Sequence, residues 1–193
     1  MRTLLFSLLL SAASLQAAWP VTVEALMAAD AASYAPPDLK RQLAKHRDRL
    51  MAGVKDAAAA ETGERDAAAH RAAAVRGARA LVKAIRQHVP FEKVAYEFGG
   101  VVHELAAASA PKGIDGASAV AAAKSSAFLG YPARPFAEPE MLATFPATAS
   151  PRAAYDTSVT AATRLLAWIW KTSGGDASVT TKYPESEGPY VVR

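Results

Sequence analysis

The chain has 193 residues, a length that fits one domain with its own apolar core. It contains no cysteine, which excludes disulfides and thiolate metal sites, so any metal must take nitrogen or oxygen ligands. The formal charge is +4, and the basic residues are interspersed with acids. This pattern favours a solvated helix surface and gives no reason to expect specific nucleic-acid binding.

The first 18 residues are typical of a secretion signal. One basic residue precedes the apolar run Leu4–Leu10, and small residues follow at Ala17 and Ala18. The run is too short for a permanent transmembrane span, and no later stretch of the sequence is long and apolar enough for one. We therefore expect residues 1–18 to be removed, leaving a periplasmic or extracellular protein that begins at Trp19.

Alanine runs dominate the rest of the sequence, and segments with alternating β-branched residues are nearly absent. Alanine has the highest helix propensity of the common residues. The composition therefore predicts an all-α, single-domain helical bundle over residues 19–175, followed by an irregular tail over residues 176–193.

The apolar spacing predicts six helices, separated by prolines and turns. A proline-rich segment, 130–151, is expected to be an extended surface loop. In chain order the predicted helices cover Val21–Ser33, a segment from Pro37 that includes Leu39–Val54, Glu64–Gln87, Phe91–Ala108, Ala117–Phe128 and Arg152–Thr172.

Two glycines, Gly99 and Gly100, lie inside the predicted helix Phe91–Ala108. Each glycine in a helix interior costs about 1 kcal/mol relative to alanine. A close crossing with a neighbouring helix would explain why they are there.

The four histidines are the main candidates for chemistry. His46 lies in a charged stretch and His88 at a helix end, so both are expected at the surface. His70 lies among alanines, and His103 falls on an apolar helix face, where a buried imidazole needs partners for its ring nitrogens. No two histidines have the i, i+4 spacing of paired metal ligands. The residues alone predict no catalytic site.

Three segments together resemble a known family. They are the expected mature start Trp19–Glu24, the helix and turn Tyr96–Pro111, and the closing helix Ala154–Gly175. They are similar to the all-helical family of zinc-dependent phospholipases C and single-strand-specific zinc nucleases. In that family the N-terminal tryptophan chelates zinc through its amine and carbonyl, and several histidines and carboxylates complete a zinc cluster that cleaves phosphodiesters.

This sequence departs from the family pattern at several metal-binding positions. His103 matches a ligand position, but Ala107 and Gly113 stand where an aspartate and a histidine are expected. Glu24 stands where many members have a histidine, and Asp56 and His70 have a separation compatible with an early ligand pair. The resemblance therefore implies no cofactor or at most one zinc ion. The residues that it offers for that ion are Trp19, Glu24, Asp56, His70 and His103.

Three functions remain open at this point. The first is an exported, non-catalytic member of this family with a binding or structural role. The second is a residual single-zinc phosphodiester hydrolase, which requires Asp56, His70 and His103 to converge. The third is an unrelated helical envelope protein that binds a protein partner or an anionic surface. The sequence identifies no partner and no substrate.

Overall fold

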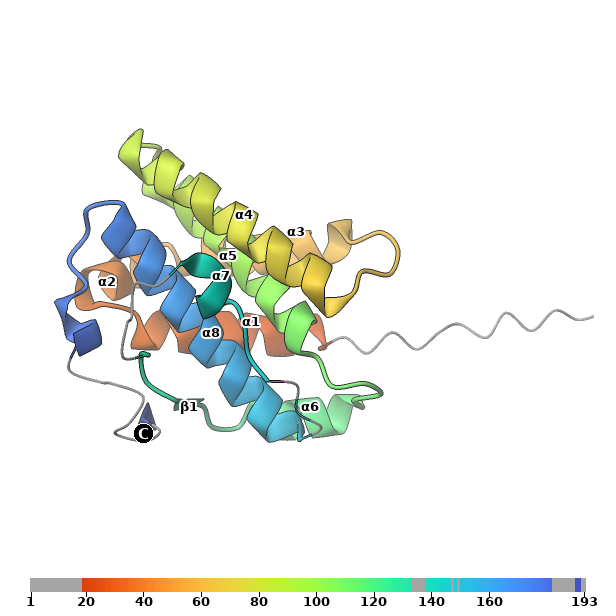
Figure 1. The fold of residues 1–193 in the computed structure, drawn as a ribbon. Coiled ribbons are helices and arrows are strands. Elements are labelled where there is room, and N and C mark those ends of the chain that lie inside the picture. Colours follow the sequence, from red (N-terminus) through yellow and green to blue (C-terminus); the bar gives the residue numbers. More distant parts are fainter. Residues whose placement is uncertain (1–18, 133–137, 147, 149, 182–189, 192–193) are drawn as a thin grey trace, which may run out of the picture.

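The structure is a computed structural model that describes residues 19–132, 138–146, 148, 150–181 and 190–191. The predicted all-α, single-domain fold is confirmed, whereas the predicted leader over residues 1–18 lies outside the described residues. The helices are α1 (Val21–Tyr34), α2 (Pro37–Lys45), α3 (Arg47–Ala60), α4 (Ala67–Arg86), α5 (Phe91–Ser109), α6 (Gly116–Ala122), α7 (Pro139–Leu142), α8 (Pro151–Thr172) and the 3-10 turn η1 (Ser178–Thr181) (Figure 1).

Local side chains explain where the long helices begin. The Asp66 carboxylate accepts a 2.7 Å hydrogen bond from the Ala69 amide at the start of α4. The Ser150 hydroxyl accepts one from the Ala153 amide at the start of α8. Such caps satisfy amide groups that the first turn of a helix leaves without a partner.

The segment 130–151, predicted as an extended surface loop, contains the short helix α7 with Leu142 buried, and the tail predicted from residue 176 contains η1 and strand β2 (Tyr190–Val191). Two predicted helices also differ from the observed ones. The segment predicted as one helix from Pro37 is divided at His46, whose backbone leaves the helical region (φ −113°). The helix predicted over Ala117–Phe128 ends at Ala122. Residues Ala127–Phe128 instead form strand β1, which pairs antiparallel with strand β2, Tyr190–Val191. The Asp156 carboxylate of α8 accepts the Ala127 amide at 2.9 Å, so a contact from a distant helix holds this segment extended.

Helix α5 lies at the centre of the bundle, packed against α3 and α4 and also contacting α1 and α8. Its crossing with α3 brings two glycines together. A Cβ atom on Gly99 would overlap backbone atoms of α3 at Leu50 and Val54, and one on Gly53 would overlap the backbone of Tyr96. The close crossing predicted from the sequence is therefore present at Gly99, while Gly100 has open space around its Cα.

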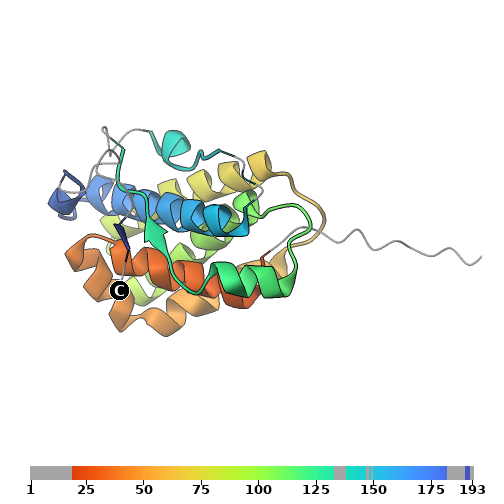
Figure 2. The same cartoon turned by 90° about the horizontal axis from the view of Figure 1, so that it is seen from below.

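Helices α1 and α8 run side by side (Figure 2). Tyr155 of α8 is fully buried between them and donates a 2.7 Å hydrogen bond to the Asp30 carboxylate of α1. Burial and this bond to a carboxylate raise the pKa of the Tyr155 hydroxyl. No helix in the described ranges combines the length and apolar character needed to cross a bilayer.

Candidate functional site: a histidine–glutamate cluster

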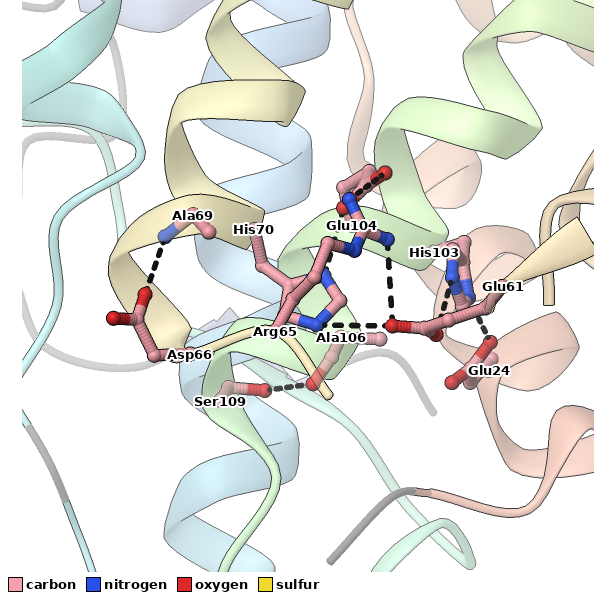
Figure 3. Close-up of polar contacts among 10 residues, drawn as sticks. All are labelled: Glu24, Glu61, Arg65, Asp66, Ala69, His70, His103, Glu104, Ala106 and Ser109. Atoms are coloured by element: carbon pink, nitrogen blue, oxygen red, sulfur yellow. Dashed lines mark hydrogen bonds and ion pairs between the residues drawn. The ribbon is translucent and has the colours of Figure 1, made fainter. Parts of the chain in front are cut away.

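Charged and polar side chains from α1, α4, α5 and the connection between α3 and α4 converge in one group (Figure 3). The first turns of α1 and α4 each supply one residue, the second half of α5 supplies two neighbours, and the connection between α3 and α4 supplies two more. We call this group the His–Glu cluster; its members are Glu24, Glu61, Arg65, His70, His103 and Glu104.

His103 is held between two carboxylates that come from different parts of the chain. Its Nδ1 lies 2.8 Å from Oε2 of Glu24, and its Nε2 lies 3.2 Å from Oε2 of Glu61. The side chains of His103 and Glu24 are each 3% exposed. The Nε2 contact is too far out of line to count as a hydrogen bond, so this nitrogen has no hydrogen-bond partner.

His70 is arranged in the same way on the other side of Glu61. Its Nδ1 lies 2.8 Å from Oε2 of Glu104, and its Nε2 lies 3.2 Å from Oε1 of Glu61. The rings of His70 and His103 are nearly perpendicular, with centroids 6.5 Å apart. Glu61 therefore bridges the two imidazoles, and each imidazole has a second carboxylate of its own.

Arg65 completes the cluster from its more exposed side. Its guanidinium donates to Oε1 of Glu104 at 3.0 Å and to Oε1 of Glu61 at 3.3 Å. Three carboxylates and one guanidinium leave an excess of two negative charges when both imidazoles are neutral. Two protons on the imidazoles, or one divalent cation, would neutralise this excess.

The geometry favours a proton on His103. Burial lowers the pKa of the His103 imidazole, but the hydrogen bond to Glu24 and the negative charges of Glu24 and Glu61 outweigh it and raise the pKa above 6.5. Burial raises the pKa of the Glu24 carboxyl, and the hydrogen bond from His103 offsets part of that rise. Both shifts mean that the folded protein holds these protons more tightly than the unfolded chain does.

The donors of the cluster contact one another rather than surround a common point. Among the described residues, no group of three or more histidine, aspartate or glutamate side chains is placed to hold a metal ion. As arranged, its members form ion pairs and hydrogen bonds with one another. For Glu61, His70 and His103 to share a metal ion, the Glu61 carboxylate would have to move from its place between the two rings.

Of the residues proposed from the sequence as metal ligands, the structure brings together Glu24, His70 and His103. Asp56 is not among them: it lies on α3 and accepts a 3.0 Å hydrogen bond from the Tyr96 hydroxyl at an exposed position. Tyr96 precedes His103 by about two turns of α5, which places the Asp56 carboxylate well away from both imidazoles. Asp56 therefore does not fill the place expected for it beside His70.

Trp19 lies near the cluster but contacts other residues. Its side chain is buried, its Nε1 donates to the Ser109 hydroxyl at 3.4 Å, and its ring meets Tyr155 edge-on. These contacts anchor the start of α1 against the end of α5 and the first turns of α8. The indole is thus part of the core.

Sequence reasoning missed Glu61, Arg65 and Glu104. Glu61 lies directly after the alanine run that ends α3, in a segment that shows no periodic pattern. Glu104 neighbours His103 in sequence, but it faces His70 because adjacent helix positions point in different directions. Only Glu104 had a signal that could have identified it: an acidic residue next to a histidine on an otherwise apolar helix.

Comparisons of this chain with protein-family models, with curated proteins and with solved structures find no match.

Proposed function

We propose that the mature chain is an exported, non-catalytic helical protein with a binding or structural role. The observation that carries this proposal is the pairing within the cluster. Every ring nitrogen of His70 and His103 lies within 3.2 Å of a glutamate oxygen. A general base or a nucleophile-activating imidazole needs one nitrogen directed at substrate or water. Here Glu104 and Glu24 bind the two Nδ1 atoms, and the Glu61 carboxylate lies 3.2 Å from each Nε2 atom, where a substrate or water would have to approach.

The likeness to the zinc phospholipase C and nuclease family supports the same conclusion. Two of its metal-binding positions correspond to Ala107 and Gly113, neither of which has a side-chain donor. Gly113 lies in a turn with φ +70°, after the end of α5. A cluster of several zinc ions needs about three protein ligands for each ion, and these positions supply none.

The test combines an assay of phosphodiester hydrolysis with identification of the N-terminal residue. The chain is expressed with its first 18 residues, recovered from the periplasm or medium, and assayed with bis(p-nitrophenyl) phosphate in the presence and absence of zinc. We expect an N-terminus at Trp19 and hydrolysis no faster than in buffer. Zinc-dependent turnover that is lost on substitution of His103 would contradict the non-catalytic proposal. A chain that stays in the cytoplasm with residues 1–18 still attached would contradict export.

One observation favours a second candidate, a single bound zinc ion without catalysis. His103 Nε2 is buried and lacks a hydrogen-bond partner, while the Nδ1 atoms of His70 and His103 are each held by a carboxylate. Metal-binding histidines are commonly oriented by such a carboxylate on the other ring nitrogen. A shift of the Glu61 side chain would let zinc bind the Nε2 atoms of His70 and His103 and one carboxylate oxygen of Glu61.

Zinc titration by calorimetry distinguishes the two candidates. If the cluster is purely structural, we expect no stoichiometric zinc binding. If it holds a single zinc ion, we expect one zinc site that is lost in His103→Asn and kept in His88→Asn. His88 is a matched control because it is exposed, lies outside the cluster and has a positive φ of 57°, which asparagine tolerates. Binding that His88→Asn weakens as much as His103→Asn would exclude the cluster as the site.

A further inference from the structure

A cleft of about 630 Å³ lies next to the His–Glu cluster. Its walls come from the first turns of α4 and α8, from the end of α5 with the turn that follows it, and from the segment before α8. No member of the cluster lines it. Its volume falls within the range of about 300–1,000 Å³ typical of small-molecule sites.

The charged side chains among the described lining residues of the cleft are all positive. Arg71 of α4 and Lys112 after α5 line it, and no acidic residue is among its described lining residues. The described part of the chain offers neither side chain an ion pair. By contrast, Arg79 of α4 pairs with Glu140, and Arg152 of α8 pairs with Asp156.

The rest of the lining is mostly apolar, with a few hydroxyl groups. The apolar lining residues include Phe145, Pro146 and alanines of α4, α5 and α8, and Ser109 and Thr157 add hydroxyls. The guanidinium of Arg71 lies 5.9 Å from the centre of the Phe145 ring, a cation–π contact that holds the charged group at the wall.

Helix dipoles do not oppose the positive charge of the cleft. The amino-terminal turns of α4 and α8 contribute partial positive charge, and the carboxyl-terminal end of α5 contributes partial negative charge. Two positive ends against one negative end leave a net partial positive charge, which adds to that of the two cationic side chains. An apolar wall beside two cations that have no ion-pair partner in the described part of the chain suits a ligand with an apolar body and a single anionic group.

We propose that this cleft binds a small organic anion, whose charged group pairs with Arg71 and Lys112 and whose apolar body packs against Phe145 and the neighbouring alanines. This site is separate from the function proposed for the cluster, because the two share no residue. If experiments rule out ligand binding in the cleft, the function proposed for the cluster can still be tested, and the reverse also holds.

Three probes with the same body test the charge requirement: 4-phenylbutanoate, 4-phenylbutanol and 4-phenylbutylammonium, titrated into the full-length mature protein by calorimetry. We expect the carboxylate to bind at least tenfold more tightly than the alcohol, and the ammonium not to bind. Inorganic phosphate tests the charge without the body and is expected to bind at least tenfold more weakly than phenylbutanoate. Equal affinities for the three phenyl probes, or phosphate binding as tight as that of phenylbutanoate, would overturn the proposal.

Two variants test whether phenylbutanoate binds in this cleft. Lys112→Gln removes an exposed charge and is expected to weaken phenylbutanoate binding about tenfold, as is Arg71→Gln. Lys124→Gln makes the same charge change on an exposed residue outside the cleft and is expected to leave binding unchanged. The circular dichroism melting curve of each variant verifies that it is folded. Folded Lys112→Gln and Arg71→Gln proteins that bind as the unmodified protein does would contradict the assignment.

Discussion

The α3/α5 crossing and the His–Glu cluster both lie within the bundle, yet they are stabilised in opposite ways. At the crossing, Gly53 and Gly99 let two backbones meet because neither has a side chain. In the cluster, long side chains from separate segments meet because their charges complement one another. An added side-chain atom should therefore destabilise the crossing, whereas the loss of a charged partner should destabilise the cluster.

The largest effect should come from adding one methyl group at the crossing. Gly99→Ala places a Cβ against backbone atoms of Leu50 and Val54, which cannot move without shifting α3. We expect a loss of about 3 kcal/mol in the free energy of unfolding, the upper end of usual overpacking effects. Urea denaturation followed by circular dichroism measures it.

The neighbouring glycine provides the control for this substitution. Gly100→Ala makes the same chemical change at a position with no atom within 4 Å of the new Cβ. Because alanine favours helix, we expect Gly100→Ala to be neutral or to stabilise by up to about 1 kcal/mol. Equal destabilisation by both substitutions would show that helix propensity rather than the crossing governs this part of α5.

The next largest effect should come from removing a partner within the cluster. Glu104→Ala takes away the carboxylate that binds both His70 and Arg65. Hydrogen bonds to charged groups contribute about 1.5–3 kcal/mol each, so we expect a loss of about 2 kcal/mol after local rearrangement. Glu97→Ala, at an exposed position on the same helix, should change stability by less than about 0.5 kcal/mol. If the two variants have the same free energy of unfolding within experimental error, the cluster has no stabilising role.

The smallest effect should be the dependence of stability on pH. The pKa of His103 is raised in the folded protein, so its contribution is complete below pH 6.5 and is lost as pH rises through the folded pKa. The raised pKa of Glu24 acts in the same direction at lower pH. Unfolding free energies should therefore fall as pH rises above about 6.5.

Two variants determine whether that slope belongs to the cluster. His103→Asn removes the imidazole and should flatten the profile, whereas His88→Asn should preserve it. A slope that survives in His103→Asn would assign the pH dependence to other groups.

The sequence indicated the fold well because its signals are local. Helix α8 begins within one residue of its prediction, since Pro151 and Ser150 mark its start, and the Gly99 crossing follows from a glycine inside an apolar helix. The break at His46 and the strand at Ala127–Phe128 were missed. The second depends on a contact from Asp156, which lies 29 residues away.

The cluster was only partly accessible to sequence reasoning for the same reason. Its contacts join residues that are 79 and 34 positions apart, for His103 with Glu24 and His70 with Glu104. No periodic pattern links such positions. Asp56 was favoured by its spacing from His70, but it lies on the face of α3 that meets Tyr96, and Glu61 lies between the imidazoles instead.

Both imidazoles are bound to glutamate partners inside the fold. The most direct test is a pH titration of the His103 ring nitrogens by ¹⁵N NMR, in the unmodified protein and in Glu24→Gln. We expect a midpoint above 6.5 in the unmodified protein and a lower one in Glu24→Gln. A His103 that titrates at or below 6.5, unaffected by Glu24→Gln, would contradict this expectation.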